Sequence, residues 1–214
     1  MSSALPIGSN TTPTPCDVLV VGGGPAGSTI SALLADQGWN VQVLEKDPHP
    51  RFHIGESLLP QTLPILKQLG VLADVEKIGI VKYGAEMVSH RYGRTQMFYF
   101  SKAFDESQPY AFEVKRSEFD AILLKNAVAK GAQVHEGVRA ERVEFRPGTT
   151  SLVHAQDKTG NPMAWETRFV VDASGRDTFL SAQLGGKQRS QTHNSAAIFG
   201  HFEGVGRLPG KDEG

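Results

Sequence analysis

The stretch VLVVGGGPAGSTISALLADQGWNVQVLEKD, residues 18–47, decides the fold of this chain. An apolar run at 18–21 leads into Gly22, Gly24 and Gly27, which form G-x-G-x-x-G before a helix-like segment. A second apolar run at 41–44 ends on Glu45. Strand, glycine turn, helix, strand and acid in this order predict a βαβ unit that binds a dinucleotide.

Each part of this unit has a physical task. Gly22 permits the tight turn out of the strand, Gly24 lets the backbone approach a pyrophosphate, and Gly27 allows close packing of helix and strand. The helix N-terminus offers N–H groups to the phosphates. The Glu45 carboxylate can accept hydrogen bonds from a ribose and repels a 2′-phosphate, which disfavours NADP. The alternative is an ordinary glycine loop.

Composition is that of an ordinary globular protein. The 214 residues are 39% hydrophobic and 21% charged, with a formal net charge of −1. This balance gives no bulk attraction to nucleic acid, and no apolar run reaches the ~20 residues that span a bilayer. A single cysteine, Cys16, excludes an intrachain disulfide and fits a cytoplasmic protein. The seven histidines lack ligand spacing, so we expect no metal site.

The rest of the chain predicts two more helices and several strands. Leucines near helical spacing predict a helix over residues 57–70, with a bend or break at Pro64. Ser117 is typical of an N-cap for a helix that ends at Ala129. Strands are expected at 82–99, with a turn at 92–94, and at 133–138, 140–145, 151–156 and 164–171, with a hairpin turn at 158–161.

Three polar constellations fall near the ends of these elements. Gly55 and Glu56 could bring backbone N–H groups to a flat ring, or they could simply enter a helix capped by Ser57. Arg116 could reach a cofactor as a bidentate donor, or could be a solvated side chain that pairs with Glu113 or Asp120.

The third constellation follows the apolar strand near residue 170. Asp172, Ser174 and Gly175 would reach the same sheet edge as the glycine turn, unless they form an ordinary turn.

Six blocks in order carry a family resemblance. They are GGGPAG, LEKD, PRFHIGESLLP, VKYGAE, VKRSEFDAILLKNAVAKGAQV and VVDASGRDTFL, within residues 22–180. The set resembles FAD-dependent oxidoreductases of the aromatic-hydroxylase superfamily, which have a glutathione-reductase-like FAD fold. The block RFHIGESLLP is most similar to flavin-dependent halogenases. The fold class implied is α/β: a Rossmann-like FAD-binding domain, βαβ with a β-meander, plus part of an inserted antiparallel β substrate layer.

The resemblance also implies roles for single residues. Glu45 would hold the adenosine ribose, Val138 would meet the adenine through its backbone, and Lys82 would position hypohalous acid. For Lys82 the alternative is a solvated lysine at a strand end. The remaining cofactor-binding residues would be Gly22, Gly24, Pro25, Ala26, Gly27, Arg51, Ile54, Gly55, Arg116, Asp172, Ser174 and Gly175.

The implied function is that of a flavin-dependent halogenase, using reduced FAD and O₂ on a small aromatic substrate, with a separate flavin reductase as partner. The alternatives are an FAD-dependent hydroxylase, a geranylgeranyl-reductase-like enzyme, or an inactive nucleotide-binding fragment. The G-D-A-type and W-x-W-x-I-P segments of the family are absent from the sequence. We therefore expect an amino-terminal portion of a longer protein.

The resemblance also suggests a division of the chain. We expect a flexible leader, two parts of the FAD-binding domain, an inserted β segment between them, and the start of a substrate domain. In that reading the leader is 1–15, the FAD-binding parts are 16–80 and 113–185, the insertion is 81–112, and the substrate domain begins at 186–214.

Overall fold

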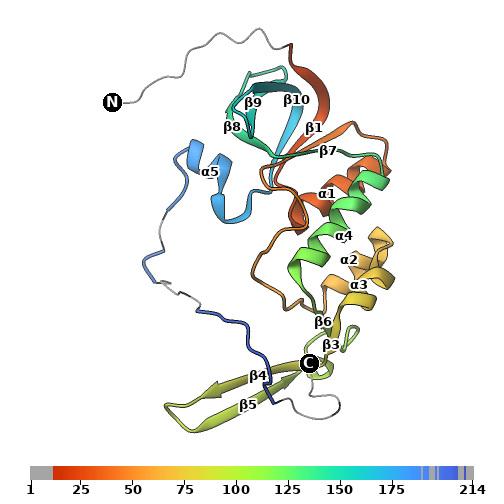
Figure 1. Ribbon diagram of the computed structural model, residues 1–214, viewed down its shortest axis with the longest axis vertical. Helices are drawn as coiled ribbons and strands as arrows, with labels where there is room; N and C mark the ends of the chain where they lie inside the picture. Colours follow the sequence, from red (N-terminus) through yellow and green to blue (C-terminus); the bar gives the residue numbers. More distant parts are fainter. Residues whose placement is uncertain (1–11, 189, 193–195, 197, 207–209, 211–214) are drawn as a thin grey trace. The chain divides into compact units, whose positions relative to one another are not determined.

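The computed structural model describes residues 12–188, 190–192, 196, 198–206 and 210. These residues form two compact units, each of which is treated by itself. The first combines the described residues up to Arg51 with Leu123–Lys187, and the second combines Phe52–Ile122 with the described residues from Gln188 onward. Figure 1 labels the elements of both.

A six-stranded mixed sheet forms the centre of the first unit, and its strand order is β7-β2-β1-β10-β9-β8. The first four strands in this order run parallel. Strand β9 then pairs antiparallel with β10, and β8 pairs antiparallel with β9. This arrangement confirms the predicted parallel βαβ core with a meander. The bounds are β1 Thr14–Val21, β2 Val41–Glu45, β7 Gln133–Glu136, β8 Val138–Glu144, β9 Ser151–Asp157 and β10 Pro162–Asp172.

The central strands are apolar along continuous runs, which is typical of strands that are buried on both faces. Every residue of β2 is buried, including Gln42 and Glu45. Helix α1 (Pro25–Asp36) connects β1 to β2 and buries a stripe of small residues, among them Gly27, Ser28 and Ala32, so its backbone packs closely. A cluster around Trp165 fills the core beside β8, β9 and β10.

The second unit holds short helices and two small sheets. Helices α2 (Thr62–Leu69) and α3 (Leu72–Ile78) precede β3 (Ile80–Lys82), which pairs antiparallel with β6 (Ala111–Glu113). Strands β4 (Gly84–Ser89) and β5 (Arg94–Tyr99) form the hairpin predicted from residues 82–99, and the short 3₁₀ turn η1 (Phe100–Lys102) follows. Helix α4 (Arg116–Ala129) begins in this unit and ends in the first.

The predicted helix over residues 57–70 is wrong in its first turn. Helix α2 starts only at Thr62, and Ser57 instead forms an antiparallel bridge with Glu113. The backbone there is extended because Leu58 N donates to Phe112 O at 2.9 Å, and a capping role for Ser57 is therefore excluded. Pro64 causes no break, because it lies in the first turn of α2, where no backbone N–H is needed.

The predicted cap of α4 is also wrong, by two positions: the helix begins at Arg116, so Lys115 is the N-cap and Ser117 lies inside the first turn. Its predicted end at Ala129 is confirmed. Across the ranges that the structure describes, we find no helix with the length and apolar character needed to cross a membrane. Residues 1–11 of the expected leader lie outside the described residues.

Candidate cofactor-binding site

The carboxyl ends of the parallel strands bring the predicted residues of the first unit to one sheet edge. Gly22 follows β1, Glu45 ends β2 and Asp172 ends β10. The register aligns these ends, because Val21 lies opposite both Leu44 and Asp172. This is the edge at which open parallel sheets bind nucleotides.

Packing requires glycine at two positions of the turn, Gly22 and Gly27, but not at Gly24. Gly22 has φ +105°, and a Cβ there would lie 2.5 Å from the Ala173 carbonyl oxygen. A Cβ on Gly27 would lie 1.8 Å from the Gly22 carbonyl oxygen. The nearest atom to a Cβ on Gly24 is Arg51 Nη2 at 3.6 Å, an ordinary contact. Internal packing therefore leaves the space beside Gly24 open.

The N-terminus of α1 is suited to an anion. Gly24 is the N-cap, it offers no side-chain cap, and Pro25 opens the helix without an N–H. The first intrahelical bond runs from Ser28 N to Gly24 O at 2.9 Å. The N–H groups of Ala26 and Gly27 thus precede the regular ladder and, with the helix dipole, can bind a pyrophosphate. The residues present fit the phosphates of a dinucleotide.

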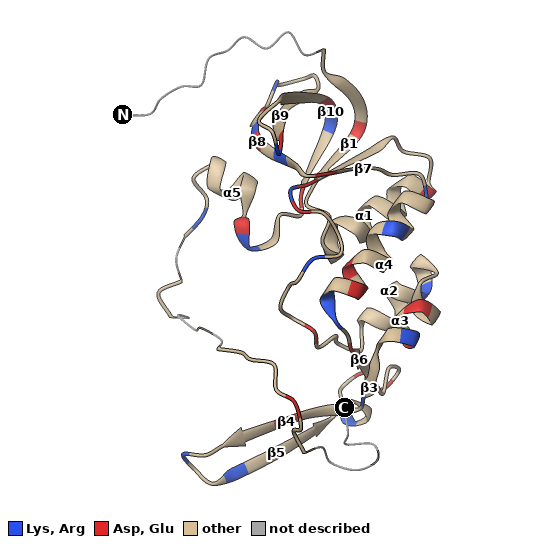
Figure 2. Cartoon of the chain, in the orientation of Figure 1, with Lys and Arg blue, Asp and Glu red and all other residues tan. Residues whose placement is uncertain are grey.

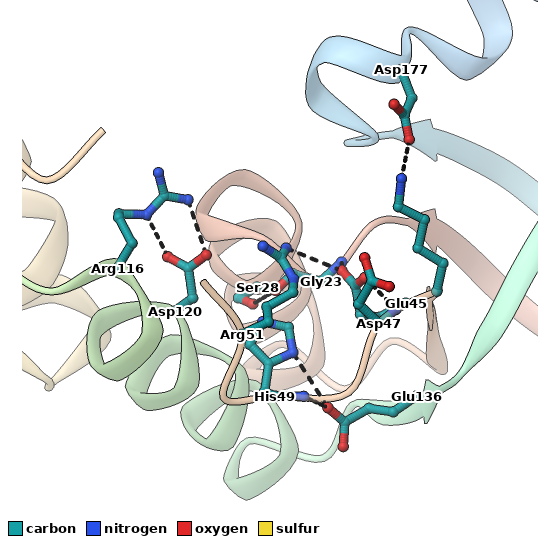
Figure 3. Close-up of polar contacts among 11 residues, drawn as sticks. Gly23, Ser28, Glu45, Asp47, His49, Arg51, Arg116, Asp120, Glu136 and Asp177 are labelled. Carbon is teal, nitrogen blue, oxygen red and sulfur yellow. Dashed lines mark hydrogen bonds and ion pairs between the residues drawn. The ribbon is translucent and has the colours of Figure 1, made fainter. Parts of the chain in front are cut away.

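Glu45 fixes the glycine turn from the neighbouring strand (Figure 3). Its side chain is buried, and Oε2 accepts a hydrogen bond from Gly23 N at 2.7 Å and lies 3.4 Å from Arg51 Nη2. Oε1 accepts from Asp47 N at 2.9 Å. A carboxylate has about four acceptor sites, so three protein donors leave about one for a ribose hydroxyl. The sequence did not indicate the Gly23 contact.

Asp172 and Ser174 fold the turn that follows β10. Asp172 Oδ1 accepts from Ser174 N at 3.0 Å, and its Oδ2 accepts from Leu180 N at 2.8 Å. Ser174 Oγ accepts from Phe179 N at 2.9 Å. Gly175, with φ +64°, begins the 3₁₀ turn η2 (Gly175–Asp177) that leads into α5 (Phe179–Gln183). These bonds form the ordinary turn that was one of the two expectations for this segment, and the turn lies at the same sheet edge as Gly22.

An ion pair connects the ends of β2 and η2. Lys46 Nζ, one residue after Glu45, contacts Asp177 Oδ2. The hydrogen bond from Lys46 lowers the pKa of the Asp177 carboxyl. Val138, the remaining predicted residue of this unit, opens β8 with its side chain in the core, so only its backbone could meet a ligand.

In the second unit, Arg116 is occupied by protein partners. Its Nε and Nη2 donate to Asp120 Oδ1 and Oδ2 at 2.7 and 2.9 Å, and Nη1 donates to Ile54 O at 3.0 Å. Asp120 is fully buried, so the pair is enclosed and not solvated. The pairing with Asp120 is one of the expected alternatives, and it also holds the turn at Ile54 and Gly55, where Gly55 has φ +107°.

Lys82, also in the second unit, is a buried lysine at the end of β3. The residue is only 5% exposed, which excludes the solvated alternative. Its Nζ contacts Ser57 Oγ and lies 5.5 Å from the centroid of the Phe100 ring. Sequence reasoning missed both partners, because Ser57 was taken for a helix cap and Phe100 carried no motif.

The βαβ sheet and the uncapped glycine turn define a dinucleotide-binding α/β protein. A family model described as "FAD binding domain" matches residues 15–203, and the chain belongs to that family. The match confirms FAD as the cofactor expected from the sequence.

Curated relatives include several halogenases. A 1H-pyrrole-2-carbonyl-(peptidyl-carrier protein) chlorinase of Pseudomonas fluorescens is 35% identical over 209 residues, which are 89% of this chain and 46% of the relative. A tryptophan 2-halogenase of Chondromyces crocatus is 37% identical over 197 residues, covering 90% of this chain and 37% of the relative. The chain thus spans less than half the length of these relatives.

Solved structures agree with this fold. A flavoprotein/dehydrogenase from Cytophaga hutchinsonii has a TM-score of 0.74 at 35% identity, over 80% of this chain and 42% of that one. The myxobacterial chondrochloren halogenase has a TM-score of 0.71 at 34% identity, over 78% of this chain and 38% of that one. The predicted halogenase-like FAD family is therefore confirmed.

Proposed function

We propose that this chain is the FAD-binding portion of a flavin-dependent halogenase that acts on a small, electron-rich aromatic molecule. One observation carries the proposal: a chain of the FAD-binding family holds a buried lysine, Lys82, whose contacts are a hydroxyl and an aromatic ring. Burying an ammonium group costs free energy unless it is well paired, which favours a chemical role for this side chain.

In this proposal the first unit binds the cofactor. The N–H groups of Ala26 and Gly27 hold the pyrophosphate beside Gly24, and Glu45 uses its remaining acceptor site for the adenosine ribose. Reduced FAD together with O₂ supplies the oxidation of halide to hypohalous acid. The further proposed contacts are Gly22, Pro25, Arg51, Val138, Asp172, Ser174 and Gly175 from this unit, and Ile54, Gly55 and Arg116 from the second.

Lys82 is the proposed catalytic residue. Its N–H groups hold the oxygen of the hypohalous acid while the halogen is transferred to an aromatic carbon. The carbon loses a proton, the oxygen leaves as water, and the sum is HOX + ArH → ArX + H₂O. The enclosed position of Lys82 limits competing attack by water.

We further propose a separate flavin reductase as the source of reduced FAD, and a cytoplasmic location, where such reductants are available. The single cysteine is consistent with a reducing compartment. Figure 2 shows Lys and Arg mixed with Asp and Glu along the chain, in keeping with a net charge of −1. We also propose the division described above, with residues 81–112 and 186–214 belonging to the substrate-binding part.

The test is a halogenation assay on the longer protein that contains this chain. With FAD, a flavin reductase, NADH, bromide and an aromatic acceptor, we expect a brominated product by mass spectrometry. Lys82→Ala should abolish the product and leave FAD binding intact.

Other products of that assay would point to the alternatives. Hydroxylated product that Lys82→Ala does not affect would contradict the proposal and favour a monooxygenase. Reduction of an alkene acceptor without bromide would favour a reductase. If the protein forms no product under any of these conditions, an inactive nucleotide-binding portion is favoured.

A further inference from the structure

Two residues from separate sequence blocks flank one short strand of the second unit. On one side of β6, Lys82 of β3 pairs with Ala111. On the other side, Ser57 bridges Glu113, and the backbone bonds from Leu58 N to Phe112 O and from Val114 N to Glu56 O hold that segment extended. Segment 56–58, β6 and β3 therefore lie in order as three antiparallel strands.

The strand register places Ser57 and Lys82 on the same face. Ala111 and Glu113 are two residues apart on β6 and so share a face, and directly paired residues share a face as well. To reach Ser57 Oγ, the Lys82 side chain must cross β6 over Ala111. The Ala111 side chain is only a methyl group and is fully buried, which leaves room for this crossing.

The charge of Lys82 is held by weak partners. Its Nζ donates to the neutral Ser57 hydroxyl and lies over the Phe100 ring. Among the described residues, no carboxylate forms an ion pair with it. Because an ammonium group has three donors, the Ser57 bond leaves N–H groups for a ligand. A carboxylate partner would bind the same ammonium more tightly and compete with that ligand.

We propose that Ser57 is a positioning residue for Lys82, and that it fixes the ammonium group across β6 with N–H groups available for hypohalous acid. The catalytic consequence rests on the function proposed above, whereas the positioning itself does not. Lys82 remains the residue that touches the reacting atoms, and Ser57 acts through it.

The positioning is tested by NMR on this 214-residue chain labelled with ¹⁵N at lysine Nζ. A buried, hydrogen-bonded ammonium group exchanges its protons with water slowly enough to give a signal. Exposed ammonium groups exchange too fast to give one. We expect one such signal, assigned by its loss in Lys82→Met. Ser57→Ala should remove the signal, and Ser57→Thr, which keeps the hydroxyl, should retain it.

Ser101→Ala serves as the matched control, because it makes the same chemical change at an exposed serine of this unit. It should leave the signal unchanged, and circular dichroism should show that all variants are folded. A slow signal that persists in folded Ser57→Ala would overturn the proposal, as would its loss in Ser101→Ala. If Ser57→Ala does not fold, the comparison of Ser57→Thr with Ser57→Val decides, since only threonine retains the hydroxyl.

A second measurement separates this proposal from the proposed function. In the longer protein, Ser57→Ala should lower brominated product per O₂ consumed by about tenfold, the effect of losing one hydrogen bond to a charged group. Ser57→Thr should recover it. If the slow signal depends on Ser57 but no bromination occurs in any variant, the positioning holds and the halogenase function fails. Unchanged bromination in Ser57→Ala would contradict the catalytic part.

Discussion

At the scale of single residues, the glycines of the turn differ in purpose: Gly27 is needed for packing, and Gly24 leaves space for a ligand. Gly27→Ala places a Cβ 1.8 Å from the Gly22 carbonyl oxygen, whereas Gly24→Ala places one in ordinary contact. We expect Gly27→Ala to lower the free energy of unfolding by about 3 kcal/mol or more, the upper range for overpacking. Gly24→Ala should change it by less than about 1 kcal/mol.

Urea denaturation followed by circular dichroism measures both values. Gly24→Ala is the control for Gly27→Ala, because it makes the same substitution in the same turn. Gly38→Ala is less suitable, because Gly38 has φ +86° and alanine would be strained there. Equal midpoints for the two variants would show that the turn does not pack on α1 as described.

His135 provides a pH prediction. Burial lowers the pKa of its imidazole from 6.5, and the ring lies 2.7 Å from Gln42 Oε1 and 5.1 Å from the Trp165 ring centroid. Because the unfolded state binds the proton more readily, the free energy of unfolding should be highest above pH 6.5. It should fall as the pH drops below that value, until the folded pKa is passed.

The pH dependence is measured by urea unfolding above and below pH 6.5. His135→Gln should flatten it in this range, while His90→Gln, at an exposed histidine, should leave it in place. A slope that survives in His135→Gln would assign the pH dependence to another group.

The sequence predicted the positions of the candidate binding residues at the ends of the strands, but it did not reveal their partners. Gly22, Glu45 and Asp172 were expected at one sheet edge because parallel strands end together, and they lie there. The bond from Gly23 N to Glu45 could not be predicted, since it depends on the path of the turn. The Arg116–Asp120 pair was predictable as an alternative, because the two residues are one helical turn apart.

At the scale of elements, three buried leucines hold α2 against the core of the second unit, and Pro64 does not disturb the helix. Leu66 is almost fully buried, so Leu66→Ala should lower the free energy of unfolding of the second unit by about 2–5 kcal/mol. Pro64→Ala should change it by less than about 1 kcal/mol, since the first turn needs no N–H there. Thermal or urea unfolding compares them, and a large loss in Pro64→Ala would contradict the position of α2.

Local patterns predicted most strands and helices, and long-range pairing explains the exceptions. The βαβ unit, the 84–99 hairpin and α4 have clear periodicity or turn residues. Residues 57–61 also have apolar residues near helical spacing, yet Leu58 bonds to Phe112, far away in sequence, and stays extended. Such pairing leaves no local signal.

At the scale of the whole molecule, the chain passes between its two units three times, after Arg51, Ile122 and Lys187. The first unit is completed by Leu123–Lys187, long after Arg51, and α4 contributes to both. From the family resemblance we expected an FAD-binding domain that is interrupted in sequence, with the insertion at 81–112. The division into cofactor and substrate parts remains a prediction for the longer protein.

The central claim is that the glycine turn and the α1 N-terminus bind FAD. Titration of FAD with this chain, followed by flavin fluorescence, tests it against Gly24→Asp. That variant adds a carboxylate where space is open, and it should fold normally. We predict saturable binding by the natural chain that excess NADP does not displace, and binding weaker by about tenfold or more in Gly24→Asp, from repulsion of the pyrophosphate. Absence of FAD binding by the natural chain, or equal affinity in the variant, would contradict the account.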